Sequence, residues 1–469
     1  MLSAIALASV AQQPPISHLE INNVRPTILG DGSCFLPGGG VDDNYIYTGI
    51  TEVACPTWDV PAGSGKGTIF QHGLWFGGLD SSEELHLAGM MFNQNGQDYA
   101  MGPLKTADAS TDFMTMAKYH RIWSLTRAEI EQFIASHANA GYQIPEDILT
   151  WPAHGEEGYA SNLAPFVDVN GDGHYSPADG DYPDIKGDQC LYFIFNDART
   201  HTETSGAAVG LEVHAMVYGF DAPDNEPLKN TVFINYKFIN RSANDYHNTY
   251  LGLFTDWDLG YSRDEFVGCD VQRNSCYVYN GSAVDGSGEP WSYDSIMPAQ
   301  VLTVLNGPDN LGMTGFMYFN NSGSPMGDPQ NAAEYYLLMR SCWRDGNHLF
   351  YGGTGYPGQS GTVGPECNYM FPGDSDPNNI GTGGVAPNGG YNTNGKYWTE
   401  ETTGNQPDDR RGLASVGPFD FPAGGVKELD YAMITVWGRE NEYGPMASFS
   451  RIGEFVDHIK ELFTNGFAK

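Results

Sequence analysis

Short apolar segments separated by turn-forming residues dominate this chain and predict strands rather than helices. The four clearest segments are rich in β-branched and aromatic residues and are bounded by Asn, Asp, Gly and Pro; they span 190–196, 211–220, 231–240 and 249–258. Weaker segments of the same kind span 300–305, 316–319, 334–340 and 429–437. Short strands at this spacing are typical of antiparallel sandwiches and barrels.

Alternation within the segment 231–240 indicates which of its faces is buried. One face carries apolar side chains only, namely Val232, Ile234, Tyr236 and Phe238. The opposite face mixes Phe233 with Asn235 and Lys237. Because successive side chains of a strand point to opposite faces, we expect the first face in the core and the second partly open to solvent.

Three segments have helical spacing instead. Thr126 and Glu129 form an S/T-x-x-E capping box ahead of an apolar stripe, which predicts a helix near 127–138. A single helical turn is expected at 145–149. A helix with one apolar face is expected at 450–463, where large apolar residues recur every three or four positions.

These elements predict a mainly β fold: an antiparallel, jelly-roll-like β-sandwich body with a few short helices and long loops. The segment 351–412 is rich in Gly, Asn, Pro and Thr and predicts one long loop. The expected regions are a signal peptide at 1–13, an N-terminal β-rich region at 14–160, a central sandwich at 161–350, the loop at 351–412, and closing strands with a C-terminal helix at 413–469.

The apolar segment at 2–10 is the basis for the predicted signal peptide. It is far too short to cross a bilayer and is followed by small residues, with a candidate cleavage site near Ala11. It lacks the preceding Lys or Arg of a complete signal, so we interpret it as truncated. No other segment approaches the length of a membrane span, and we expect an extracellular or outer-surface location.

Charge narrows the range of partners. The 469 residues include 58 acidic and 23 basic side chains, a net charge of −35, which disfavours nucleic acids and anionic membranes as partners. Aromatic residues make up 13% of the chain, which excludes a disordered protein. Charged residues are only 17%, so most polarity comes from uncharged side chains, as in turn-rich extracellular β proteins.

The segment DVNGDGHYSPAD at 168–179 has the spacing of a calcium-binding loop. The candidate ligands are Asp168, Asn170, Asp172, the carbonyl of His174, Ser176 and Asp179, with Gly173 at the sharp turn. No amphipathic helices flank the loop, so we expect a structural Ca²⁺ rather than a helix-pair sensor. Asp181 is a further candidate ligand, and the alternative is a polar turn without metal.

A second acidic group lies at the end of a predicted strand. Asp256 and Asp258 flank Trp257, so both carboxylates point to one face of the strand. Three interpretations remain open: a second cation site, a pair of catalytic carboxylates, or solvated loop acids. The sequence contains neither a G-x-S-x-G nor an H-E-x-x-H motif, so an enzymatic function is less expected than a non-enzymatic one.

Short motifs along nearly the whole chain resemble a family of large secreted proteins. They are INNVR at 21–25, GLWFGGLD at 73–80, WPAHG at 151–155, APF at 164–166, GDYP at 180–183, GDQ at 187–189, FND at 195–197, NRS at 240–242, DWDLG at 256–260, VGCD at 267–270, YNG at 279–281, DRR at 409–411 and GPF at 417–419. As a set they resemble Bacteroidetes surface proteins that are exported by the type IX secretion system and typically end in a type A sorting domain.

This resemblance implies a β-rich protein at the outer cell surface or outside the cell, with no established catalytic residues to carry over. Such proteins usually continue into a further sandwich and the sorting domain, whereas this sequence ends soon after the last predicted helix. We therefore expect that a sorting domain was removed or lies outside this chain.

We expect a calcium-stabilised structural or adhesion protein. One form of this function is a subunit of an extracellular fibre or surface layer. Its expected partners are copies of itself or other surface proteins. The alternative is a secreted glycan-binding protein or a glycoside-active enzyme, in which Asp256 and Asp258 act on or beside a sugar.

Overall fold

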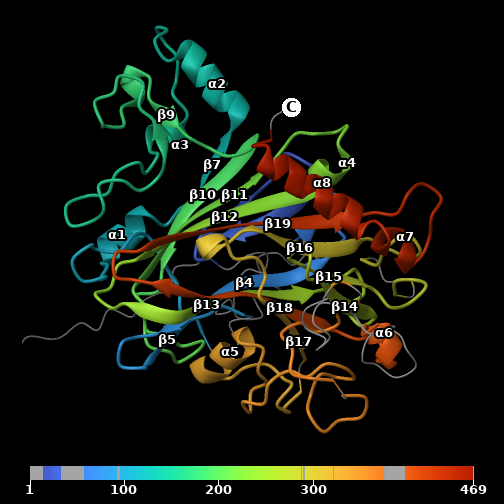
Figure 1. Ribbon diagram of the computed structural model, residues 1–469. Coiled ribbons are helices and arrows are strands. Elements are labelled where there is room, and N and C mark those ends of the chain that lie inside the picture. The colour runs from blue at the N-terminus through green and yellow to red at the C-terminus, as the bar shows by residue number, and fades with distance from the viewer. Residues whose placement is uncertain are drawn as a thin grey trace, which may run out of the picture.

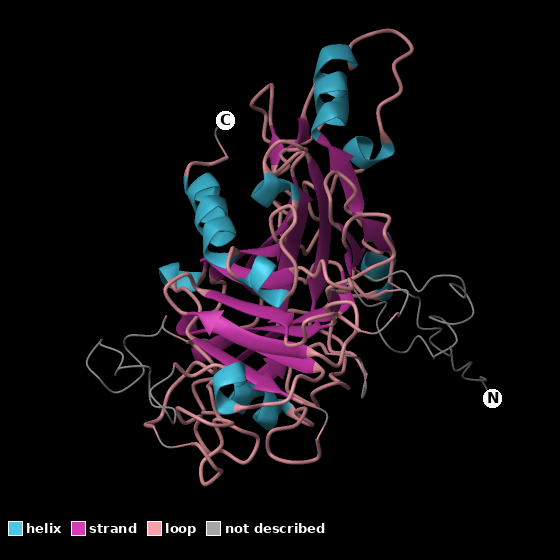
Figure 2. Ribbon diagram, turned by 90° about the vertical axis from the view of Figure 1, so that its right-hand side faces the viewer, coloured by secondary structure: helices cyan, strands magenta, loops and turns pink. Residues whose placement is uncertain are grey.

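A computed structural model describes residues 14–32, 58–91, 96–286, 288, 291–320, 322–362, 364–373, 375 and 397–467. Two large antiparallel sheets lie face to face, with short helices on the outside (Figure 1; Figure 2). This arrangement confirms a mainly β, sandwich-like fold, whereas the jelly-roll connectivity stays a prediction. The predicted signal peptide at 1–13 and residues 376–396 of the predicted loop lie outside the described residues.

The larger sheet has nine strands. Their order is β14 (Glu265–Asp270), β15 (Ser275–Asn280), β16 (Ala299–Asn306), β19 (Val426–Val436), β12 (Thr231–Asn240), β11 (Leu211–Gly219), β10 (Gln189–Asn196) and β6 (Ala100–Met101), with β7 (Trp123–Thr126) also paired to β10. The five-stranded sheet has the order β17 (Gly315–Phe319), β18 (Arg410–Phe421), β13 (Tyr246–Trp257), β4 (Ile69–Leu79) and β5 (Leu85–Ala88). Both sheets combine strands from the N-terminal, central and closing parts of the chain.

Smaller elements surround the two sheets. A three-stranded sheet contains β1 (Ile16–His18), β2 (Arg25–Leu29) and β3 (Trp58–Asp59), and a short hairpin contains β8 (Phe166–Val167) and β9 (Tyr182–Pro183). The helices are α1 (Phe113–Lys118), α2 (Arg127–Ser136), α3 (Glu146–Leu149), α4 (Glu226–Lys229), α5 (Ala332–Met339), α6 (Glu400–Thr403), α7 (Pro445–Phe449) and α8 (Ile452–Thr464), with 3₁₀ turns at Pro177–Asp179 and Pro308–Asn310. Within the described chain, no helix has both the length and the apolar character needed to cross a membrane.

Strand β12 shows how the core is built. Its Phe238 packs between the sheets against Phe76 of β4, with ring centroids 5.5 Å apart. On the opposite face, Phe233 stacks on Tyr218 and belongs to a second buried cluster, which also contains the apolar side of α8. Lys237, on the same face, is half-buried. The predicted core face is confirmed. The opposite face is more closed than expected, because every residue of β12 except Lys237 is buried.

The predicted helices were largely right, and one predicted strand was wrong. Thr126 caps α2 with the expected reciprocal box, and α3 and α8 form where the apolar spacing placed them. The segment predicted as a strand at 334–340 is instead helix α5, which Asn331 caps. Its short apolar run fits the spacing of a strand as well as that of a helix. In the structure, the helix brings the ring of Tyr335 against Trp75, with the ring centroids 4.4 Å apart.

The end of the predicted 351–412 loop also differs from the expectation. It contains α6, and residues 410–412 already belong to β18. Arg410 and Arg411 occupy ladder positions in this strand, although their charge is unusual for a buried strand. Buried acidic partners make this placement favourable, and the local sequence does not reveal those partners.

Loops and helices cover three outer edges of the large sheets, those of β14, β17 and β5. At the edge of β14, the Val267 N–H donates to Glu400 Oε2 of α6 at 2.7 Å. At the edge of β17, the Phe316 N–H donates to the Asn368 carbonyl at 2.9 Å, and β5 is covered through Leu87 in the same way. Covered edges disfavour the addition of strands from other molecules.

Candidate metal centre

Pairing between β13 and β18 creates an acidic site at one end of the five-stranded sheet. The strands run antiparallel with Asp256 opposite Arg411, so the end of β13 lies beside the start of β18. Asp258 follows β13 directly, and its N–H donates to the Thr68 carbonyl at 3.2 Å. Asp409 immediately precedes β18. Two chain segments far apart in the sequence therefore bring three acids together.

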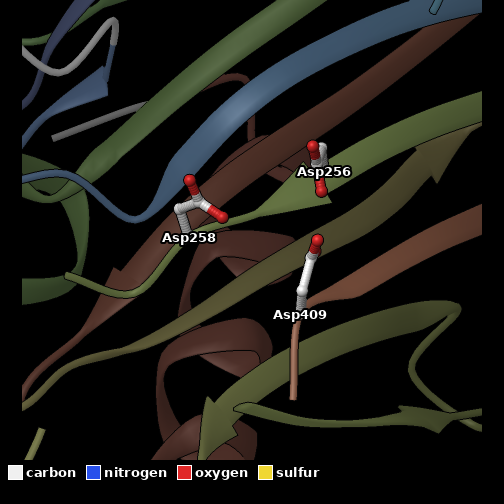
Figure 3. Close-up of side chains that lie close together, drawn as sticks. All are labelled: Asp256, Asp258 and Asp409. Atoms are coloured by element: carbon white, nitrogen blue, oxygen red, sulfur yellow. The ribbon is translucent and has the colours of Figure 1, made fainter. Parts of the chain in front are cut away.

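The three carboxylates gather around one small space (Figure 3). One oxygen from each of Asp256, Asp258 and Asp409 lies within 4.8 Å of the others. Asp256 is only 3% exposed, and the other two are half-buried. Across the described ranges, no other set of three or more acidic, His or Cys side chains meets this geometry.

Arg411 is the guanidinium in contact with this site, and several acids share it. Its Nη1 donates to both oxygens of Asp328, at 3.0 and 2.9 Å. Its Nε lies 3.5 Å from Asp256 Oδ1, and its Nη2 lies 3.7 Å from Asp409 Oδ2. One positive charge divided among these carboxylates leaves a negative excess at the site.

Burial makes this excess costly. Burial, and then the charge of Asp258, raise the pKa of Asp256 well above its usual range. Burial, and then the charge of Asp409, raise the pKa of Asp258 to about 8. In addition, Asp256 Oδ1 is buried and accepts no hydrogen bond from the described residues. Bound protons or a bound cation relieve such a site, because either removes the repulsion between buried charges.

Glu265 of β14 links the two arms of the site. Its Oε1 accepts the N–H of Leu259, next to Asp258, at 3.1 Å. Its backbone forms a bridge to Asp408, next to Asp409. Glu265 is fully buried, and its Oε2 accepts no hydrogen bond from the described residues. It lies outside the group of three, but burial and then the charge of Asp258 raise its pKa well above the usual range, so it adds a fourth acid that interacts with the centre.

The predicted calcium loop at 168–179 lies elsewhere, between β8 and β9. Asp168 accepts the N–H groups of Gly171 and Gly173 at 2.7 and 2.8 Å. The exposure of the candidate ligands varies: Asn170, Asp172, His174 and Asp179 are exposed, whereas Asp168 and Ser176 are half-buried. The strands on either side agree with the expectation that no helix pair flanks this loop.

The side chain of Asp181 holds the backbone of this loop through hydrogen bonds. It is fully buried, and its two oxygens accept the N–H groups of Val169 and Ser176 at 2.8 and 2.9 Å. The loop carboxylates do not form a group of three within ligand reach in the described structure. Calcium binding at this loop stays a prediction. The carboxylates that do lie close together are those of Asp256 and Asp258, with Asp409.

The arrangement favours cation binding over glycosidic catalysis. A glycosidase needs two carboxylates on either side of a sugar bond, with room for substrate or water between them. Here Asp256 is almost completely buried, and the three carboxylates crowd one space. Their shared environment instead resembles an oxygen-only ligand set for a hard divalent cation.

Asp409 is the ligand candidate that sequence reasoning missed. It follows a turn-rich segment, and its neighbours in the sequence give no strand or metal-loop spacing. The available signal was the run Asp408–Arg411, in which two acids precede two arginines. Such a run indicates local ion pairing, but it does not show which distant carboxylates lie opposite.

Comparison with known proteins gives no family assignment. No protein-family model matches the chain, and no curated protein matches it.

Proposed function

We propose that this chain is a secreted or cell-surface protein with a structural or adhesive role, stabilised by Ca²⁺ held between Asp256, Asp258 and Asp409. The observation that carries the proposal is the convergence of these carboxylates, with one oxygen from each within 4.8 Å of the others. Oxygen ligands bind Ca²⁺ at about 2.3–2.6 Å, so two ligands of one ion lie up to roughly 5 Å apart. An oxygen-only set suits this ion better than zinc or copper, which favour nitrogen and sulfur.

A cation at this position joins parts of the chain that are distant in sequence. Asp258 leads out of β13 and is tied to Thr68, just before β4, whereas Asp409 leads into β18. The three strands are neighbours in the five-stranded sheet. Binding therefore cross-links the ends of adjacent strands, and a ligand that binds only the folded chain stabilises it by mass action.

Composition supports a location outside the cell. The chain is strongly acidic, and its polarity comes mostly from uncharged side chains. The motif resemblance to type IX-secreted surface proteins points to the same place. Calcium sites in extracellular modules bind at about 10⁻⁴–10⁻³ M, an affinity that a site with few protein ligands can reach.

The covered sheet edges bear on the structural role. Because β14, β17 and β5 already have backbone partners at their outer edges, contacts with other molecules are expected through side-chain surfaces. Strand addition at these three edges is disfavoured, so we expect self-assembly into a fibre or layer to use a side-chain interface. Light scattering at high protein concentration, with Ca²⁺ and with EGTA, measures such assembly, and a strictly monomeric particle in Ca²⁺ would contradict the fibre form.

Thermal unfolding with Ca²⁺ or with EGTA tests the cation centre. We expect Ca²⁺ to raise the Tm by a few degrees, since a ligand at a hundred times its Kd contributes about 2.7 kcal/mol. Asp258→Asn should remove this shift while preserving the size of the side chain. Asp224→Asn, at an exposed acid, is the matched control and should keep it.

Asp168→Asn separates the two candidate calcium sites. If the Tm shift survives in Asp168→Asn and disappears in Asp258→Asn, the cation acts at the three-carboxylate centre. The opposite pattern would assign the effect to the 168–179 loop and contradict the proposed centre. Terbium luminescence excited through Trp257, which lies between Asp256 and Asp258 in the chain, gives a direct binding measurement.

A further inference from the structure

A polar cleft adjoins the three-carboxylate centre. It consists of two hollows of about 430 and 190 Å³, which share Tyr318, Asn320, Asp408 and Arg410 as lining residues and therefore form one continuous surface. Their combined volume lies in the range of sites that bind small ligands.

The cleft meets the cation centre at Asp409. This residue lines the larger hollow and also belongs to the group of three carboxylates. Its side chain is 30% exposed, whereas that of Asp256 is 5% exposed. Of the three acids, Asp409 is the one that lines the cleft, so the centre reaches the cleft through this residue, whereas Asp256 is closed off by protein. Ca²⁺ takes six to eight oxygen ligands, so positions beyond those filled by three carboxylates are available on the side of the cleft.

The remaining lining is suited to hydroxyl groups. The larger hollow adds Arg263 and Ser322, and the smaller one adds Asn405 and Gln406. Arg263 and Gln406 are exposed residues of this lining, so their donors can reach a ligand in the cleft. Amide, hydroxyl, carboxylate and guanidinium groups together both donate to and accept from a polyol.

The aromatic residues beside the cleft act as walls rather than as stacking surfaces. The guanidinium of Arg410 lies over the Tyr318 ring, 5.0 Å from its centroid. Arg410 is itself fixed by Glu400 and by the Gln406 carbonyl. Trp343 lines the smaller hollow but is only 1% exposed. Recognition in this cleft therefore depends on hydrogen bonds and metal coordination.

Charge selects among hydroxyl-rich ligands. Asp408 and Asp409 line the cleft beside Arg263 and Arg410, but Arg410 is already paired with the buried Glu400, and the whole chain carries a net charge of −35. These charges repel uronic and sialic acids more strongly than neutral sugars. We propose that this cleft binds a neutral saccharide in a Ca²⁺-dependent manner, with sugar hydroxyls completing the coordination of the cation. This inference rests on the proposed calcium centre and adds a ligand class to it.

A glycan array identifies the ligand class. The full chain is applied with Ca²⁺ and with EGTA to neutral oligosaccharides of mannose, galactose, glucose and N-acetylglucosamine, and to uronic acid oligosaccharides. Isothermal titration then measures the affinity for the best neutral sugar. We expect binding to neutral sugars only, with its loss in EGTA.

The double variant Arg263→Ala with Gln406→Ala tests the cleft itself. Both residues are exposed, so the fold and the Ca²⁺-induced Tm shift should be retained, while saccharide affinity falls at least tenfold. Asn139→Ala, at an exposed residue outside the cleft lining, is the control and should bind sugar normally.

The outcomes separate the two proposals. Absence of saccharide binding, preference for uronic acids, or binding unaffected by EGTA or by the double variant would each overturn the saccharide inference, while a preserved Ca²⁺ shift leaves the calcium centre standing. Absence of any Ca²⁺ effect on the wild-type Tm would overturn the calcium centre as well.

Discussion

Asp256 of β13 and Arg411 of β18 occupy opposite positions of one antiparallel ladder, with Asp256 Oδ1 3.5 Å from Arg411 Nε. Arg411 also binds both oxygens of Asp328, so it neutralises only part of the charge at the acidic centre. This incomplete neutralisation is the physical reason why the site suits a cation.

Arg411→Gln tests the balance of charges. In EGTA, we expect the free energy of unfolding to fall by about 3 kcal/mol, because Asp256 and Asp328 lose their buried partner. In Ca²⁺, we expect a larger stabilisation than in the wild type, because the centre has lost a positive charge. Urea unfolding in both buffers measures the two effects.

Arg25→Gln is the control for this experiment. Arg25 pairs with Glu20, whose side chain is 61% exposed, and such pairs contribute about 1 kcal/mol or less. A response of Arg411→Gln to Ca²⁺ equal to that of the wild type would contradict the electrostatic account of the centre.

Glu265→Gln tests the fourth carboxylate. The amide oxygen of Gln can still accept the Leu259 N–H, so the fold is expected to remain intact. Calcium affinity should fall by about tenfold or more, the loss typical of groups behind the direct ligands of a metal. Terbium titration measures it, with the exposed Glu401→Gln as the control. Equal affinities in the two variants would remove Glu265 from the site.

The buried carboxylate of Glu212 is expected to make the stability of the fold sensitive to acid. Burial alone raises the pKa of its carboxyl, but hydrogen bonds and charge from His214 and Arg241 outweigh burial and lower that pKa to about 2. Because the folded pKa lies below the unfolded value near 4.5, the stabilisation is present above pH 4.5 and is lost as the pH falls toward 2. The shift corresponds to about 3 kcal/mol.

Glu212→Gln should therefore lower stability at neutral pH and flatten the acid limb of the stability profile. Urea unfolding between neutral and acidic pH measures both effects. Glu20→Gln, at an exposed ion pair, is the control. A variant that keeps the wild-type slope between pH 4.5 and 2 would show that Glu212 does not carry this sensitivity.

Gly73→Ala tests the close packing of β4. A Cβ at Gly73 would lie 2.3 Å from the Met90 carbonyl oxygen, a backbone atom that cannot rotate away. We expect a loss of about 1–3 kcal/mol in the free energy of unfolding. Gly323→Ala is the matched control, since nothing lies within 4 Å of the added Cβ. Equal stabilities would mean that the β4 backbone shifts freely.

Local sequence patterns determined much of the fold. Alternation in 231–240 placed Phe238 in the core, and the box of Thr126 and Glu129 placed the start of α2. These signals are local, because a strand or a capped helix repeats its burial over a few residues. The segment that became α5 was misread, since its short apolar run fits both periods until Tyr335 packs on Trp75.

The candidate site required the tertiary structure. The sequence placed Asp256 and Asp258 on one face of a strand end, but it left solvated acids, a cation site and a catalytic pair all open. Pairing of β13 with β18 brought Asp409 and Arg411 to the same place and buried Asp256. Strand order and register arise from packing between distant segments, so only the folded chain could decide which charges meet.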